Sequence, residues 1–277
     1  MSPRDLTRLA ELTEAEVNRQ YVTATSERGR VALGISAADI GGGFSLAMRN
    51  DPTGGGWNKT LGIGFAEPVT KKLIGEVVDF HREHGSPSAQ VQIAPELLPP
   101  DWEDIREAFG LTPGGHMMKF ACAVEDFKPG TTDLRVGLVD PQDVDKWATM
   151  LSVIFGMPEH FDSMIAGTGR RPDFRPLAAW DGDEMVAGGS LFIDGDVASL
   201  NTGATKASHR NRGIQSALLT ARAQAAAEAG CRWLVTETGK PTEGESNSSY
   251  NNMLRSGFTL LYARQSWIWK PGGVVAA

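Results

Sequence analysis

The feature of this sequence that most constrains its fold is an alanine-rich segment, residues 214–229, which is predicted to form a long helix. The helix is expected to end at Gly230, because glycine readily adopts the left-handed conformation found just beyond helix C-termini. Apolar runs on either side, at 197–205 and 232–237, predict strands. This strand, helix, strand order indicates an α/β fold.

The first 130 residues alternate in the same way. Apolar residues at three- and four-residue spacing predict a helix over 6–26, and short apolar runs at 31–35 and 44–48 predict strands around a glycine turn. From residue 57 the predicted order is strand, helix, strand, helix, strand, at 57–65, 69–84, 89–94, 102–109 and 116–124.

The stretch 126–143 contains several turn-forming residues around one apolar run, 134–139, and a domain boundary is expected just before that run. Beyond it a helix is predicted at 140–155, opened by Asp140 and Pro141. The segment 157–176 contains glycines and prolines and is expected to be irregular. Further strands are predicted at 177–180, 185–193 and 197–205, and the end of the chain is expected to form a strand at 232–237, a helix at 249–255 and a strand at 260–269.

Both halves of the chain are expected to end alike, with a strand, a long helix, a strand, a short helix, a glycine-containing corner and a last strand. The two corners lie near Phe109 and Phe258. This similarity favours an internal duplication. We therefore expect two tandem α/β domains, 1–130 and 131–277, each a mixed central sheet flanked by helices.

Charge and composition limit the classes of partner. The formal net charge is −7, whereas a nucleic-acid or anionic-membrane partner calls for a basic surface. No run of about 18 apolar residues and no secretory leader is recognised, so a cytoplasmic protein is expected. Cys122 and Cys231 form no metal-binding or CxxC pattern, and the pair His81 and His84 lacks a third ligand, so no metal is expected.

The residues that most suggest a ligand-binding site lie at the start of the long helix. A helix N-terminus offers unpaired N–H groups and partial positive charge, which suit a phosphate. Gly213 permits close approach of the backbone, and Arg210 and Arg212 add charge. The alternative is a basic helix start on a solvated surface.

The segment 210–215, Arg-Asn-Arg-Gly-Ile-Gln, resembles the signature Arg/Gln-x-x-Gly-x-Gly/Ala of the Gcn5-related N-acetyltransferase (GNAT) superfamily. A second segment, 245–258, is similar to the later helix and Gly-Phe corner of that family. The order of elements also agrees, so the resemblance covers about 134–270. The N-terminal half agrees only in element order.

The resemblance implies that acetyl-CoA binds in the C-terminal half. Its pyrophosphate would contact backbone N–H groups within 210–216, and its pantetheine would pair with 203–205 like an added strand. Gln215 stands where the family has a small residue. Asn252 is either a CoA contact or a surface residue. The implied set is Gly203, Ala204, Thr205, Arg210, Asn211, Arg212, Gly213, Ile214, Gln215, Ser216 and Asn252.

Catalysis by direct attack on the thioester requires an acceptor for the amine proton. Glu237, at the end of a predicted strand, is either this base or an exposed strand-end acid. A backbone N–H near Ala204 would bind the thioester oxygen. Where the family has a tyrosine as acid this chain has Met253, so Tyr250 or Tyr262 could substitute, unless both are packing residues or no acid is needed.

The acceptor is expected to be an amine of a small molecule or peptide. The segment 155–174, with Phe155, Met157, His160 and Phe161, falls where the family has its acceptor loop, unless it is simply a packed loop. A longer acyl-CoA as donor and a monomer or homodimer both stay open.

The N-terminal half is expected to lack a second CoA site. Its strand-to-helix segment 65–78 has no Arg-x-x-Gly pattern and places Glu67 and Pro68 near the helix start. One CoA per chain is therefore expected, with the N-terminal domain degenerate. The alternative function is a CoA-binding regulatory or scaffold protein without catalysis, which the methionine at 253 would allow.

Overall fold

The computed structural model describes residues 2–158, 160–241 and 247–272, which form two compact units. Unit 1 comprises Met1–Thr23, Glu27–Met118 and Tyr262–Ala277, and unit 2 comprises Ala24–Ser26 and Lys119–Leu261. The units therefore divide the chain differently from the expected boundary at 130. Two long strands, β5 (Thr112–Ala123) and β11 (Thr259–Trp269), each contribute residues to both units.

Unit 1 is a sheet with helices on both faces. Its strand order is β1-β2-β3-β4-β11-β5, in which β3 and β4 are parallel and β4 and β11 antiparallel. Its elements are α1 (Pro3–Ala24), α2 (Glu27–Leu33), β1 (Ile35–Ile40), β2 (Gly43–Met48), β3 (Lys59–Leu61), α3 (Lys71–Glu83), β4 (Ala89–Gln92) and α4 (Trp102–Ala108).

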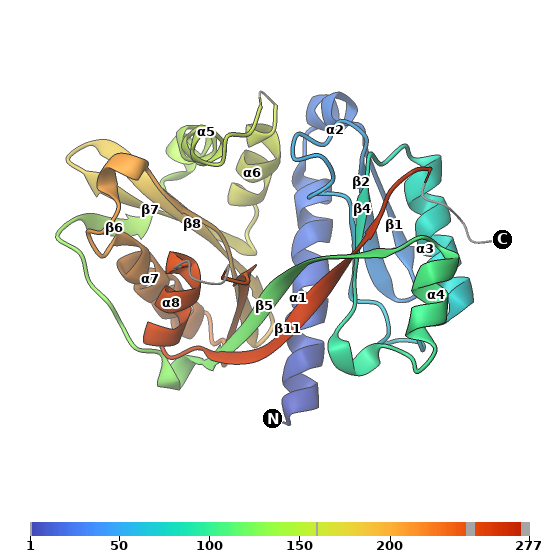
Figure 1. Cartoon of the computed structure of the whole chain (residues 1–277). Helices are drawn as coiled ribbons and strands as arrows, with labels where there is room; N and C mark the ends of the chain where they lie inside the picture. The colour runs from blue at the N-terminus through green and yellow to red at the C-terminus, as the bar shows by residue number, and fades with distance from the viewer. Residues whose placement is uncertain (1, 159, 242–246, 273–277) are drawn as a thin grey trace. The chain divides into compact units, whose positions relative to one another are not determined.

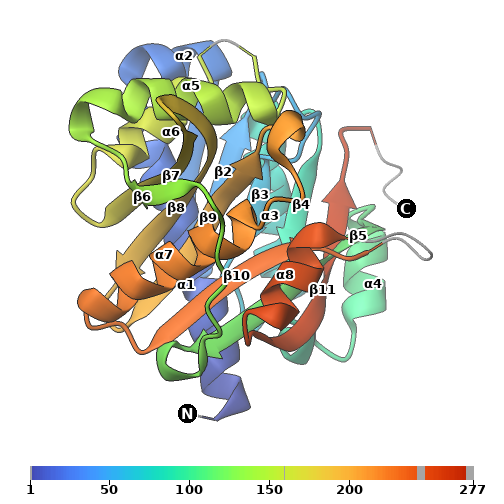
Figure 2. The ribbon, with the colours of Figure 1, turned by 90° about the vertical axis from the view of Figure 1, so that its left-hand side faces the viewer.

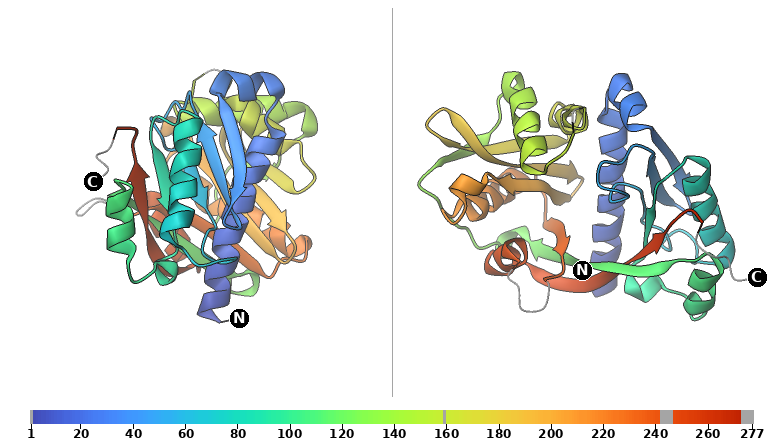
Figure 3. Two further views of the ribbon diagram at one scale, coloured as in Figure 1. Left: turned by 90° about the vertical axis from the view of Figure 1, so that its right-hand side faces the viewer. Right: turned by 45° about the horizontal axis from the view of Figure 1, so that its top comes forward.

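The two faces of this sheet have separate apolar cores. Helices α1 and α3 lie on opposite faces of this sheet (Figure 3). On one face, Ile74 and Val77 of α3 pack against Val91 of β4. On the other, Ala15 of α1 packs against Leu46 of β2. Helices α3 and α1 are thus held to the sheet by two separate groups of buried apolar residues.

Two predictions in unit 1 are wrong. The expected strand at 31–35 is replaced by the end of α2, which buries Leu33 and leaves Val31 exposed, and β1 begins only after Gly34 turns the chain with φ +63°. The expected strand 57–65 is limited to β3. Gly62 and Gly64 have φ of +73° and +93°, so the chain leaves the sheet there.

Unit 2 has the strand order β5-β10-β9-β8-β7-β6, in which β9 and β10 are parallel and the strands from β9 to β6 antiparallel (Figures 1 and 2). Its elements are β6 (Arg135–Leu138), α5 (Val144–Ile154), α6 (Asp162–Gly169), β7 (Phe174–Asp181), β8 (Glu184–Asp194), β9 (Val197–Thr205), α7 (Ile214–Glu228), β10 (Trp233–Gly239) and α8 (Ser248–Arg255).

Two neighbouring glycines of β8 allow a different helix to pack closely on each face of the sheet. A Cβ at Gly188 would lie 2.6 Å from Nε1 of Trp147 on α5, whereas a Cβ at Gly189 would lie 3.1 Å from the guanidinium carbon of Arg222 on α7. The Trp147 indole is fully buried and donates to the carbonyl of Leu177. Helices α5 and α7 thus pack against opposite faces of β8.

The segment 157–176 is not irregular as expected, because it contains α6. Met164 and Ile165 of this helix are buried. Gly167, which looked like a loop residue, lies where a Cβ would be 2.1 Å from the carbonyl oxygen of Ala24. This glycine is required by close packing rather than by a turn. No helix among the described residues is long and apolar enough to cross a membrane.

Candidate functional site

The loop between β9 and α7 contains two residues in the left-handed conformation. Asn211 has φ +64° and Gly213 has φ +73°. Asparagine is among the few residues other than glycine that tolerate this region. Helical hydrogen bonding then begins with the N–H of Ala217, which donates to the Gly213 carbonyl at 3.0 Å. The N–H groups of residues 214–216 precede this bond and have no side-chain cap in the described structure.

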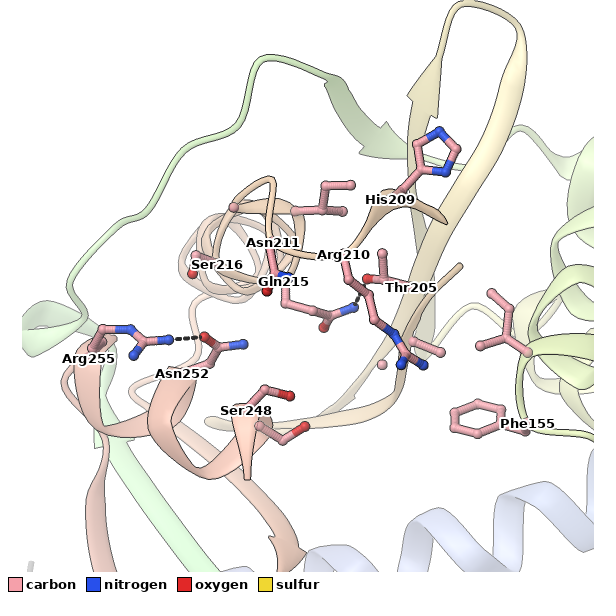
Figure 4. Close-up of a pocket in the computed structure, with 16 residues that line it drawn as sticks. Phe155, Thr205, His209, Arg210, Asn211, Gln215, Ser216, Ser248, Asn252 and Arg255 are labelled. Atoms are coloured by element: carbon pink, nitrogen blue, oxygen red, sulfur yellow. Dashed lines mark hydrogen bonds between the residues drawn. The ribbon is translucent and has the colours of Figure 1, made fainter. Parts of the chain in front are cut away.

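These N–H groups border a pocket of about 630 Å³ (Figure 4). A volume of this size is typical of small-molecule and cofactor sites. The end of β9, the start of α7, one face of α8 and the end of α5 supply the walls. The lining residues are 154–155, 203–205, 209–211, 213–216, 248–249, 252 and 255.

The pocket brings together most of the residues expected to bind acetyl-CoA. Ten of the eleven line it: Gly203, Ala204, Thr205, Arg210, Asn211, Gly213, Ile214, Gln215, Ser216 and Asn252.

Arg212 is the exception. Its guanidinium donates to Asp181 at 2.8 Å and to Asp133 at 2.7 Å, and it does not line the pocket. These hydrogen bonds from Arg212 lower the pKa of both carboxyl groups. Two carboxylates therefore hold the Arg212 side chain outside the pocket wall, and a contribution of its charge to phosphate binding stays a prediction.

The residues before β6 pack against the start of α7 and explain its glycine. A Cβ at Gly213 would lie 2.4 Å from the carbonyl oxygen of Thr131, well inside van der Waals contact. The Thr132 hydroxyl donates to the Arg212 carbonyl at 2.7 Å, and the Gly130 N–H donates to the Thr220 hydroxyl at 2.8 Å. We call residues 128–134 the strap. Gly213 is thus required by the strap as well as by its own φ.

Gln215 does not point away from the site. Its amide Nε2 donates to the Thr205 hydroxyl at 2.6 Å, so the side chain reaches from α7 to the end of β9 (Figure 4). Its Oε1 lies 3.3 Å from the position of a Cβ on Gly203. A large residue at this position therefore narrows the part of the pocket along β9.

Two arginines bring positive charge to the pocket. The Arg210 side chain extends from the loop toward Phe155 (Figure 4). Arg255 on α8 donates to the amide oxygen of Asn252 at 2.5 Å. Asn252 therefore presents its amide group at the wall in an orientation fixed by its neighbour on the same helix.

Strand β9 has an irregularity beside the pocket. Gly188 pairs with Ala204 and Ser190 with Asn201, so one residue of β8 faces two of β9. Thr202 in this bulge has φ +53°. Pairing with β10 runs from Val197 only as far as Ser199. Beyond that point, residues 203–205 of β9 line the pocket.

Glu237, the expected base, lies on β10 and not in the pocket wall. Its carboxylate is 3.5 Å from Nζ of Lys119, whose side chain is almost fully buried. The structure therefore gives Glu237 a partner that sequence reasoning did not foresee.

Neither expected tyrosine lines the pocket. Tyr250 on α8 packs edge-on against Phe120, with ring centroids 5.4 Å apart. Tyr262 belongs to unit 1, where its hydroxyl donates to Glu11 at 2.7 Å. Burial and the Glu11 carboxylate raise the pKa of Tyr262, so this phenol holds its proton tightly. Met253 is buried.

The expected acceptor segment is only partly at the pocket. Phe155 lines it and is 41% exposed, whereas Phe161 is buried in unit 2. His160 has φ +76°, and the neighbouring residue 159 lies outside the described residues. Residues 245 and 246 of the second family-like segment also lie outside them.

The corresponding helix start in unit 1 is different in kind. The Thr70 hydroxyl accepts a hydrogen bond from the Leu73 N–H at 3.2 Å, so α3 has its own cap.

His81 on the same helix is buried and hydrogen-bonds Thr60 and Ser86 through its two ring nitrogens. Among the described residues, no group of three or more potential metal ligands gathers.

Sequence reasoning missed four polar residues of the pocket. Ser248, Ser249 and Arg255 lie on α8 with Asn252, and His209 precedes Arg210. Helical spacing from Asn252 could have found Ser248 and Arg255, because residues three and four apart share a helix face.

Comparisons with known proteins agree with this geometry. Residues 144–245 match the family model described as "Acetyltransferase (GNAT) family". A GCN5-related N-acetyltransferase from Kribbella flavida superposes with a TM-score of 0.59 at 17% identity, covering 92% of this chain and 96% of that one. A tandem GNAT protein from the clavulanic acid biosynthesis pathway superposes with a TM-score of 0.58 at 13% identity, covering 88% and 86%. Among curated proteins no sequence matches this chain.

The chain therefore contains a GNAT-family domain at residues 144–245, within unit 2. This confirms the resemblance found in the sequence, and the predicted α/β fold class of tandem GNAT-like form is confirmed as well.

Proposed function

We propose that this chain transfers an acetyl group from acetyl-CoA to an amine of a small molecule or peptide. The observation that carries the proposal is the pocket at the start of α7. Its uncapped N–H groups at 214–216 and its arginines face the same volume as the open end of β9. These are the features that a diphosphate followed by an extended amide chain requires.

The residues present fit acetyl-CoA in three respects. The helix N-terminus and the Arg210 side chain suit the pyrophosphate. The backbone of 203–205 offers hydrogen-bonding groups to the pantetheine amides, once the Gln215 side chain moves or bonds to them. Asn252, held by Arg255, offers its amide from α8.

When bound, acetyl-CoA supplies an acetyl thioester activated for attack by an amine. The residues of the chain then have two tasks. Backbone N–H groups at the β9 bulge, near Ala204, bind the thioester oxygen as negative charge develops on it. A proton acceptor removes the proton of the incoming amine, and because Glu237 does not line the pocket, it would take this proton through water.

The amine approaches from the side of Phe155, the exposed aromatic residue at the end of α5. No tyrosine of the pocket wall is available to protonate the leaving thiolate, since the described lining contains none. The residues of the pocket wall would then leave protonation of the departing thiolate to solvent.

A second candidate function is CoA binding without transfer, as in a regulatory or scaffold protein. The position of Glu237 favours it, because the carboxylate lies 3.5 Å from Nζ of Lys119 and does not line the pocket. The two functions differ in turnover but not in CoA binding.

The test combines binding with turnover. Acetyl-CoA binding is measured by the rise in melting temperature, which follows from preferential binding to the native state. Release of free CoA thiol is then followed with a panel of amines. Binding with thiol release that depends on one amine supports transfer. Binding without release for any amine supports the scaffold function, and absence of binding contradicts both.

A further inference from the structure

Arg222 on α7 is a buried cation that the mechanism above does not use. Its side chain is 3% exposed. Nε donates to the Leu218 carbonyl at 3.1 Å, and Nη1 lies 3.4 Å from the carbonyl oxygen of Asn201. No ion pair with a carboxylate is found for it among the described residues. Burial lowers the pKa of its guanidinium to about 10, which still leaves the group charged at neutral pH.

The guanidinium lies directly against the bulge of β9. Asn201, whose carbonyl it approaches, is the last residue before Thr202, which has φ +53°. Its Nη2 is 3.6 Å from the position of a Cβ on Gly203, and Gly203 lines the pocket. The positive charge of Arg222 thus lies next to Gly203, which forms part of the pocket wall.

The sheet makes room for this group. A Cβ at Gly189 of β8 would lie 3.1 Å from both Cζ and Nη1 of Arg222, closer than nearly all such contacts. Gly189 is the residue of β8 that faces the bulge, because its neighbours pair with Ala204 and Asn201. The bulge, the glycine and the guanidinium therefore form one arrangement.

Packing alone does not account for the arrangement. A buried charge without a partner of opposite sign costs free energy, and an apolar side chain of similar size would fill the space at lower cost. A preorganised positive charge beside a site where negative charge develops is, in contrast, a common source of catalysis.

We propose that Arg222 is a positioning residue for acetyl transfer: it holds the Asn201–Gly203 bulge so that backbone N–H groups face the thioester oxygen, and adds its positive charge beneath them. The inference rests on the proposed function. It goes further by assigning a role to a helix residue outside the pocket wall.

The test uses acetyl-CoA labelled with ¹³C at the thioester carbonyl, whose infrared band reports polarisation of that carbonyl without any amine. In the original protein the bound band lies at lower frequency than the free one. Arg222→Met loses roughly half or more of that shift. Arg222→Lys keeps more of the shift, because lysine retains the positive charge but lacks the planar guanidinium with its several N–H donors. Arg232→Met, at an exposed arginine, is the matched control.

Gly189→Ala displaces the guanidinium without removing it and guards against misfolding of the arginine variants. Its control is Gly137→Ala, where a Cβ meets nothing within 4 Å. With an identified amine, Arg222→Met lowers kcat by about 10- to 100-fold, less than loss of a direct oxyanion donor, while KM for acetyl-CoA changes little. The melting temperature of this variant stays unchanged or rises.

The outcomes separate the two proposals. If the original protein shows no bound band, acetyl-CoA does not bind, and the proposed function fails together with this inference. If the original band shifts but Arg222→Met and Gly189→Ala leave it unchanged, only the role of Arg222 is overturned. If Arg222→Met lowers the melting temperature while its bound band stays at the frequency seen in the original protein, Arg222 is a packing residue, and the proposal is again overturned.

Discussion

Gly213→Ala tests the local structure on which the whole site depends. Two costs follow from the structure. Alanine at φ +73° costs about 1–2 kcal/mol, because its Cβ crowds the following carbonyl in the left-handed region. The same Cβ would lie 2.4 Å from the Thr131 carbonyl, so the strap has to move, at a further cost of about 1–3 kcal/mol.

Gly230→Ala separates these costs at the other end of the same helix. Gly230 has φ +83°, but a Cβ there meets nothing within 4 Å, so this variant has only the conformational cost. Gly213→Ala is therefore expected to destabilise by about 1–3 kcal/mol more than Gly230→Ala, a difference of several degrees in melting temperature.

Both variants are compared by calorimetric melting and by acetyl-CoA titration. Gly213→Ala should weaken acetyl-CoA by about tenfold or more, since a shift of the loop misplaces the helix N–H groups. Gly230→Ala should leave the affinity unchanged. Equal melting temperatures for the two variants would refute the packing of the strap against Gly213, and unchanged affinity in both would refute the role of the loop.

Three further outcomes are expected. Arg210→Gln should weaken acetyl-CoA more than Arg212→Gln does, because Arg212 is engaged by two carboxylates, and the reverse order would contradict this geometry. Glu237→Gln should lower kcat by roughly ten- to a thousandfold with little change in CoA affinity; unchanged turnover across a pH series would exclude it as the base. Burial lowers the pKa of His81 from 6.5 to about 4, so as pH falls through this interval the unfolded chain gains a proton that the folded chain does not. The free energy of unfolding of the original protein, relative to that of His81→Gln, should therefore fall by about 3 kcal/mol between pH 7 and pH 4. Denaturant titrations measure this difference. A difference that does not change with pH would show that His81 is not buried as described.

The sequence predicted the elements of the site closely because local signals agreed there. Strand β9 has the predicted bounds, and α7 begins at the predicted residue after Gly213. Apolar periodicity, a left-handed glycine and a glycine stop all act within a few residues of one another. The pocket residues followed because they lie on these same elements.

Long-range contacts decided what the sequence could not predict. The partners of Arg212 are about 30 and 80 positions away, at Asp181 and Asp133. Gly167 lies in a segment with the composition of a loop, yet it belongs to α6, where the Ala24 backbone leaves no room for a side chain. The return of β11 to unit 1 is likewise a matter of tertiary pairing, with β4, and no local pattern encodes it.

Isothermal titration calorimetry shows whether acetyl-CoA binds in unit 2 at the start of α7, and how many molecules bind. One acetyl-CoA per chain is expected, because the start of α3 in unit 1 is capped by Thr70, whereas the start of α7 has no side-chain cap among the described residues. Gly213→Glu is expected to abolish the binding heat, since its Cβ would lie 2.4 Å from the Thr131 carbonyl oxygen and the displaced loop would misplace the helix N–H groups. A stoichiometry near two, or binding that survives Gly213→Glu, would contradict a single site at the start of α7.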